Sequence, residues 1–173
     1  MNSVNRVRKL GEVIVRMSVE KSYLEDFGIG EKAVSPGRTV TEADIVMFAG
    51  ISGDWNELHT NEEYMKNSPL GKRIAHGMLT LSVASGLALR MRGRPPVEVL
   101  AFLGMDNVRF VAPVFIGDTI RVESEVIEAR QSESRPEAGV LRFKNTVKNQ
   151  RNEAVATWDT ALMVNTRLKE HSL

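Results

Sequence analysis

The stretch from Gly77 to Met91 constrains the fold more than any other part of the sequence. It contains no proline, and Arg90 is its single charged residue, which is typical of a helix that is buried on most sides. Four longer segments follow it, at 97–110, 119–131, 139–150 and 154–165. In the second and third, apolar and polar residues alternate, which predicts antiparallel strands with one buried face. A long apolar helix followed by such strands predicts an α+β fold with the sheet curled around the helix.

The composition is that of an ordinary globular chain and narrows the possible functions. With 173 residues, 42% hydrophobic and 26% charged, the chain fits a single domain. Its 23 Lys and Arg nearly balance 22 Asp and Glu, so we expect no nucleic-acid partner. The absence of cysteine excludes disulfides, cysteine-ligated zinc and thiol nucleophiles. Since no apolar run resembles a secretory signal or a membrane span, we expect a cytoplasmic protein without a membrane partner.

Residues 1–22 predict an amphipathic helix ahead of the main domain. One face is apolar and the rest is largely basic, the apolar positions being Leu10, Val13, Ile14 and Met17. We expect this helix to pack on the body of the protein, with binding to a membrane surface as the alternative. The main domain is expected over 23–167, followed by a tail over 168–173, which includes His171 and has no assigned role.

A second helix is predicted to start at Thr41. Thr41 and Asp44 form a capping box, because a hydroxyl and an acidic group three residues later satisfy free backbone amides. We expect Ile45, Phe48 and Ile51 to face the core and the helix to end near Gly53.

Directly after this helix, two side chains suited to proton transfer lie five residues apart. Gly53 and Asn56 favour a turn, so Asp54 and His59 could converge on one small ligand. Hydration of an activated double bond needs one group to take a proton from water and another to protonate the carbon next to the carbonyl. In the alternative interpretation, Asp54 caps a short helix and His59 bonds to a backbone carbonyl. The spacing is compatible with both.

His76 and Gly77 mark the start of the long apolar helix. Backbone amides there lie at the positive end of the helix dipole, so the Gly77 amide could stabilise an oxyanion. The alternative is an ordinary helix start with His76 as a partly buried hydrogen bonder. A metal site of Asp54, His59 and His76 is conceivable, but the sequence offers no close histidine pair and no third carboxylate at ligand spacing.

Two motifs together carry a resemblance to a known family. Residues 52–59, Ser-Gly-Asp-Trp-Asn-Glu-Leu-His, and residues 74–79, Ile-Ala-His-Gly-Met-Leu, resemble the MaoC-like, (R)-specific enoyl-CoA hydratase family. The likeness extends from Tyr23 to the last strand. It implies a hot-dog fold, in which an antiparallel sheet wraps a long helix and two subunits pair.

The resemblance also implies roles for individual residues. Asp54 and His59 match the family's catalytic pair, Gly77 its oxyanion amide, Ser85 a serine that supports the active site, and Asn56 an asparagine that shapes the loop; His76 is expected to support the site as well. One position departs from the pattern, because the family usually has proline where this chain has Glu57. This carboxylate would repel that of Asp54 if it pointed inward, and we expect it to point to solvent.

The implied activity is reversible hydration of trans-2-enoyl-CoA to (R)-3-hydroxyacyl-CoA, the reaction of a hydro-lyase. The implied partner is a thioester of coenzyme A or of acyl carrier protein, and no cofactor is expected. The implied assembly is a homodimer or a dimer of dimers. Two alternatives stay open, an acyl-CoA thioesterase and a noncatalytic hot-dog protein that binds acyl thioesters.

Overall fold

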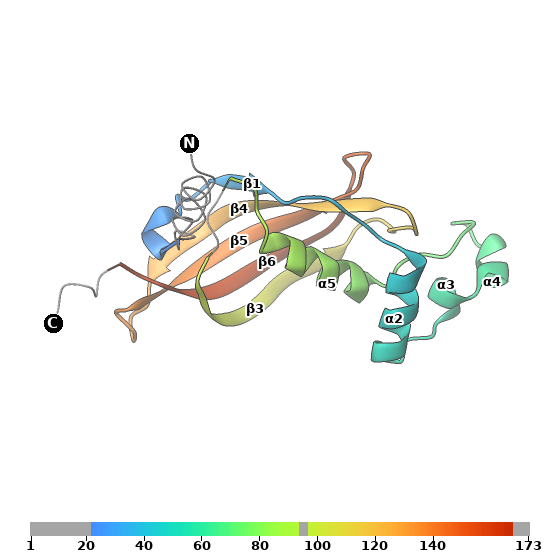
Figure 1. The fold of residues 1–173 in the computed structure, drawn as a ribbon, viewed down its shortest axis with the longest axis horizontal. Helices are drawn as coiled ribbons and strands as arrows, with labels where there is room; N and C mark the ends of the chain where they lie inside the picture. The colour runs from blue at the N-terminus through green and yellow to red at the C-terminus, as the bar shows by residue number, and fades with distance from the viewer. Residues whose placement is uncertain (1–21, 94–96, 168–173) are drawn as a thin grey trace, which may run out of the picture.

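The computed structural model of the protein describes residues 22–93 and 97–167 (Figure 1). The N-terminal helix predicted over 1–22 therefore lies outside the described residues, apart from Ser22. The tail over 168–173, with His171, lies outside them as well.

Within the described residues, six strands form one antiparallel sheet. Its order is β1-β4-β5-β6-β3, and β2 also pairs with β4. The strands are β1 (Lys32–Val34), β2 (Arg38–Thr39), β3 (Val99–Phe110), β4 (Thr119–Gln131), β5 (Ala138–Lys148) and β6 (Ala154–Asn165). The four long strands lie where they were predicted, and the alternation in β4 is confirmed, because Ile120, Val122 and Val126 are fully buried.

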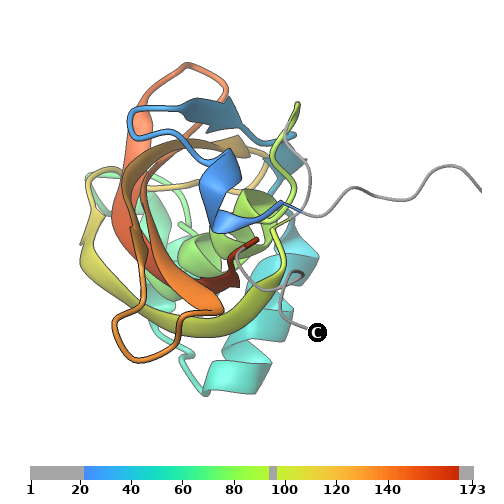
Figure 2. The ribbon, with the colours of Figure 1, turned by 90° about the vertical axis from the view of Figure 1, so that its left-hand side faces the viewer.

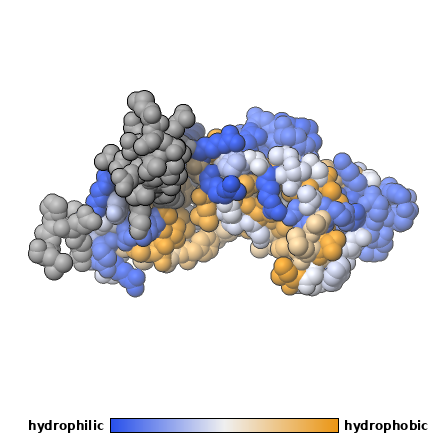
Figure 3. Space-filling view, viewed as in Figure 1, coloured by the Kyte–Doolittle hydropathy of each residue, from blue (hydrophilic) through white to orange (hydrophobic). Residues whose placement is uncertain are grey.

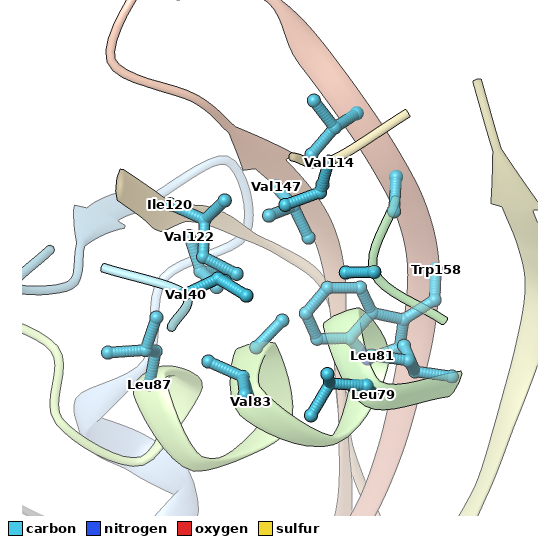
Figure 4. Packing of buried hydrophobic residues seen from close by; sticks show 14 of the residues in the cluster. Val40, Leu79, Leu81, Val83, Leu87, Val114, Ile120, Val122, Val147 and Trp158 are labelled. Carbon is cyan, nitrogen blue, oxygen red and sulfur yellow. The ribbon is translucent and has the colours of Figure 1, made fainter. Parts of the chain in front are cut away.

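The long apolar stretch forms helix α5 (Gly77–Ala88), and the sheet curls around it (Figure 2). The helix and the inner face of the sheet share one hydrophobic cluster, in which Leu79, Leu81 and Val83 of α5 lie with Val122 and Trp158 of the strands (Figure 4). The predicted α+β arrangement, a sheet wrapped around a helix, is confirmed.

Three shorter helices, α2 (Glu42–Ser52), α3 (Glu57–Thr60) and α4 (Glu62–Lys66), gather at one end of the sheet (Figure 1). The predicted capping box is confirmed: Thr41 Oγ1 accepts the Asp44 N–H at 3.4 Å, and Asp44 Oδ2 accepts the Thr41 N–H at 2.8 Å. The helix ends at Gly53, whose φ of 74° suits glycine.

The prediction that Ile51 faces the core is wrong. Ile45 is fully buried, but Ile51 is 86% exposed. It lies in the last turn of α2, and the free end of that helix projects away from α5 (Figure 1). The helical period of a sequence shows which way a side chain points from its own helix. It does not show whether a neighbouring element, here α5, extends far enough to cover that side chain.

None of the helices in the described part of the chain is long and apolar enough to cross a bilayer.

Candidate active site

The loop between α2 and α3 brings Asp54 beside His59. Asn56 caps α3, because its Oδ1 accepts the Leu58 N–H at 3.0 Å, and the Asn56 N–H donates to Asp54 Oδ1 at 3.2 Å. His59 lies in α3, and its Nε2 is 4.0 Å from Asp54 Oδ2. The structure thus brings together the two side chains that the spacing had paired, and it gives the capping role to Asn56 rather than to Asp54.

His59 is buried, and a backbone carbonyl fixes its ring. Its Nδ1 lies 2.8 Å from the Ile74 carbonyl oxygen. Because a carbonyl only accepts, Nδ1 carries the proton, and Nε2 of the neutral ring is left with a free lone pair directed to the side of Asp54. The bond to a backbone carbonyl was the alternative interpretation of His59, and here it coexists with the carboxylate pairing.

His76 connects the two motifs. Its ring is 2% exposed and stacks on the His59 ring, with centroids 3.8 Å apart and planes inclined by 30°. Its Nε2 lies 3.0 Å from the Asp54 carbonyl oxygen and must donate to it, whereas its Nδ1 has no partner among the described residues. His76 therefore carries a proton on Nε2, and it holds the backbone of Asp54.

Gly77 opens α5, and its N–H has no partner within the described parts of the chain. A Cβ at this position would lie 3.1 Å from ring atoms of Phe110, so only glycine fits without displacing that ring. Gly77 and His59 line the same cavity, of about 360 Å³, together with Thr80 and Phe110. His59 and the first residue of α5 thus border one hollow, whereas Asp54 is not among its lining residues.

Ser85 and Glu57 lie apart from this group. Ser85 is eight residues along α5 from Gly77, about 12 Å at 1.5 Å per residue. Its hydroxyl donates to the Ser82 carbonyl at 2.8 Å, and it lines a different, larger cavity. Glu57 is exposed and accepts a hydrogen bond from Asn61 Nδ2 at 2.9 Å, so the expectation that it points to solvent is confirmed.

Asp54, His59 and His76 each offer one ligand atom, all within 4.8 Å of one another. Imidazole lone pairs lie in the ring plane, and stacked rings direct them side by side rather than toward one point. Both histidines already bond a carbonyl through one nitrogen. A metal ion would have to lie about 2.0 Å from a nitrogen of each ring, in the direction of both lone pairs. The geometry therefore fits proton transfer better than metal binding.

Comparison with known proteins gives the chain's relationships. The family model described as "MaoC like domain" matches residues 26–149. Over 99 residues, the chain is 40% identical to an (R)-specific enoyl-CoA hydratase from Rhodospirillum rubrum, a match that covers 57% of this chain and 65% of the hydratase. Protein MaoC from Klebsiella aerogenes is 42% identical over 102 residues, 59% of this chain and 30% of that protein. The chain thus spans less than two thirds of the length of these relatives.

Two solved structures extend the comparison to the fold. A monoamine oxidase regulatory protein from Archaeoglobus superposes with a TM-score of 0.76 at 41% identity, covering 86% of this chain and 97% of that one. A Mycobacterium tuberculosis protein described as having a double hot-dog fold matches with a TM-score of 0.73 at 21% identity, covering 88% of this chain and 47% of that protein. The fold is therefore the hot-dog fold.

Proposed function

Because this chain belongs to the MaoC-like domain family, we propose that it is a hydro-lyase that adds water to trans-2-enoyl-CoA and gives (R)-3-hydroxyacyl-CoA, or catalyses the reverse dehydration. One observation carries the proposal: His59 and Gly77, whose N–H has no partner within the described residues, line the same hollow, and His59 Nε2 lies 4.0 Å from Asp54 Oδ2.

In this proposal, Asp54 and His59 act together on one water: the Asp54 carboxylate accepts a hydrogen bond from it and activates it, and His59 transfers its proton. A water molecule held between them loses a proton to His59 Nε2 as its oxygen bonds to the β-carbon of the enoyl group. The imidazolium then returns that proton to the α-carbon, so one water is consumed and both groups recover their starting state. The 4.0 Å between Nε2 and Oδ2 leaves the two groups without a direct hydrogen bond that would compete with the water.

The Gly77 amide would act on the thioester. Negative charge moves to the thioester oxygen when the β-carbon is attacked, and a helix-end N–H stabilises that charge. Asn56 and His76 would act as positioning residues, since one bonds the Asp54 carboxylate through its N–H and the other bonds the Asp54 carbonyl.

We also propose that the working unit is at least a homodimer. The edge strand β3 carries exposed apolar side chains, and hydrophobic surface gathers along it in Figure 3. Met78, Ser82 and Gly86 of α5 form an exposed stripe with Leu89, the residue that follows the helix, so a second copy could lie against both this stripe and β3. If the two α5 helices ran antiparallel, Ser85 of one copy would approach Gly77 of the other, which would reconcile its expected supporting role with its distance within one chain.

Incubation with crotonyl-CoA tests the activity. The proposal expects loss of enoyl absorbance without release of free thiol, and chiral analysis should identify the (R) product. Free thiol released from saturated acyl-CoA would instead support a thioesterase. Binding of acyl-CoA without hydration of any enoyl-CoA, or enoyl thioester of acyl carrier protein, would favour a noncatalytic protein, a possibility consistent with the regulatory name of the Archaeoglobus structure.

A further inference from the structure

A row of polar side chains crosses the otherwise apolar inner face of the sheet. Ser124 of β4 pairs with Asn145 of β5, and Thr160 of β6 continues the row. Ser124 and Asn145 are 5% and 1% exposed, whereas Thr160 is half-buried. On one side of the row lies the cluster around Trp158 and α5, and on the other lies the cluster around Phe143. Buried polar groups destabilise a core unless each is satisfied, so such a row needs an explanation.

The hydrogen bonds within the row leave one donor, the hydroxyl of Thr160, without an acceptor among the described residues. Ser124 Oγ donates to Asn145 Oδ1 at 2.8 Å. Asn145 Nδ2 donates to Thr160 Oγ1 at 3.0 Å and to the Phe143 carbonyl at 3.3 Å. Trp158 Nε1 donates to the same Thr160 Oγ1 at 2.6 Å. The Phe143 carbonyl fixes the amide orientation, because the flipped amide would set two oxygens against each other.

A hydroxyl accepts through two lone pairs and donates one proton. Both lone pairs of Thr160 are taken by N–H donors, so its proton has to point elsewhere. Within the described residues, nothing accepts it. A donor without an acceptor at this place favours a ligand that brings one.

The row lines a cavity of about 720 Å³ between the C-terminal half of α5 and strands β3 to β6. The remaining lining is mostly apolar, with Met91, Phe102 and Leu162 among it. Arg90 is the single charged lining residue, and its side chain is exposed. The interior therefore offers a hydrogen-bond donor in apolar surroundings but no cation that would neutralise a buried carboxylate.

We propose that this cavity binds the distal part of the acyl group and selects acyl groups that carry an uncharged oxygen acceptor, such as a keto or ether oxygen, facing Thr160. The inference rests on the proposed function, since it takes an acyl thioester as the ligand. Ser85, which lines this cavity, lies about 12 Å along α5 from Gly77, so the oxygen lies far from the thioester. A plain alkyl tail would cover the Thr160 donor without replacing its hydrogen bond to water, which disfavours binding about 10-fold.

Saturated thioesters test the inference separately from the chemistry, because they cannot be hydrated. Calorimetry would compare decanoyl-CoA with oxodecanoyl-CoAs whose keto group is moved along the distal half of the chain. The expected result is that one isomer binds about 10-fold more tightly than decanoyl-CoA. Equal affinities throughout, or no binding of any of them, would overturn the proposal whether or not crotonyl-CoA is hydrated. Tightest binding by the decanedioyl thioester, which ends in a carboxylate, would overturn it too.

Two substitutions locate the preference. Thr160→Val keeps the shape and removes the donor, so decanoyl-CoA should bind about 10-fold more tightly than it does to the unmodified protein, and the favoured oxo isomer should lose its advantage. Thr160→Ser keeps the hydroxyl and should keep the advantage, and an unchanged preference in Thr160→Val would contradict the assignment. Loss of the acceptor for Trp158 and Asn145 could prevent Thr160→Val from folding. In that case the comparison of decanoyl-CoA with the oxodecanoyl-CoAs on the unmodified protein still tests the proposal.

Discussion

At the scale of single residues, two stacked imidazole rings use the same chemistry in different ways. Each donates one N–H to a backbone carbonyl, His59 to Ile74 and His76 to Asp54. The remaining nitrogen of His59 lies 4.0 Å from the Asp54 carboxylate, whereas that of His76 is buried and has no partner in the described part of the chain. One ring is thus suited to exchange protons with a substrate, and the other to hold the loop in place.

Removing either member of the Asp54 and His59 pair should nearly abolish hydration. Asp54→Asn and His59→Gln keep the size of the side chains, so we expect an intact fold and a fall in kcat of about 10²- to 10⁴-fold, the range for a lost general acid or base. Crotonyl-CoA kinetics and circular dichroism would measure both. Glu57→Gln is the matched control, because this exposed neighbour should leave turnover unchanged. Full turnover in either pair variant would exclude the mechanism.

Replacing His76 should affect turnover through Asp54 rather than through substrate binding. His76→Phe keeps a stacking ring and removes the N–H that holds the Asp54 carbonyl, so we expect kcat to fall about 10- to 100-fold with little change in KM. His76→Gln, whose amide can donate to the same carbonyl, should recover part of that loss. If His76 were only structural, both variants would have a lower melting temperature. The kcat of the folded fraction of each variant would then equal that of the unmodified protein.

The sequence predicted part of this site, because Asp54 and His59 lie close in the chain and their local turn brings them together. It identified His76 as a hydrogen bonder but not as the residue that holds Asp54, a contact across 22 positions. The Thr160 network was missed entirely. It joins three strands through their register, and pairing between strands far apart in sequence cannot be read from local spacing.

At the scale of elements, Glu57 shows how the chain tolerates a departure from its family's pattern. It occupies the first position of α3, after the Asn56 cap. Proline is favoured at this position, because its fixed φ suits the helix and its missing N–H would have no helical partner. Glutamate can stand there because Asn56 already supplies the cap.

Glu57→Pro should therefore be accepted. We expect unchanged turnover and a free energy of unfolding that is equal or higher by about 0.5 kcal/mol, since proline restricts the unfolded chain. Urea denaturation and crotonyl-CoA kinetics would measure both. A large loss of activity would mean that the Glu57 carboxylate, or its bond to Asn61, contributes to the site.

Arg73 ties the short helices together at their end of the sheet. Its guanidinium bonds both oxygens of Glu42 in α2, at 2.8 and 2.7 Å, and Glu62 of α4 at 2.8 Å. The hydrogen bond from Arg73 lowers the pKa of Glu42 below its ordinary 4.5. A lowered carboxylate pKa stabilises the fold above the unfolded value, and this contribution is lost as the pH falls through the folded one.

Arg73→Gln should lower the free energy of unfolding by about 1 kcal/mol at neutral pH, a modest value because both glutamates are about half exposed. The difference from the unmodified protein should shrink as the pH falls from about 4.5 through the lowered pKa of Glu42, because a protonated Glu42 no longer forms an ion pair with Arg73. Denaturation at several pH values measures this, with Lys66→Gln, in a fully surface pair, as the control. A difference that stays constant with pH would show that Arg73 acts through packing alone.

At the scale of the whole molecule, the sequence predicted a sheet curled around a helix but not the order of its strands. Alternation shows which face of a strand is buried and says nothing about its neighbours. In the structure β3 precedes β4 in the chain yet pairs with β6, the last strand. That arrangement leaves β3 as a long edge with side chains such as Leu100 and Leu103 about half exposed.

An exposed apolar edge of this length favours association, and in a closed twofold pair the same surface of each copy would be covered. Sedimentation should give at least twice the 19.3 kDa of one chain. Leu103→Glu sets a charge on the proposed interface without entering the core, so we expect a folded monomer with greatly reduced hydration, because the site would lose the Ser85 of its partner.

Ile127→Glu, at an exposed position of β4 that is 38% accessible, should remain dimeric and active. A Leu103→Glu variant that stays dimeric would place the contact elsewhere, and one that is monomeric but fully active would show that a single chain holds the complete site.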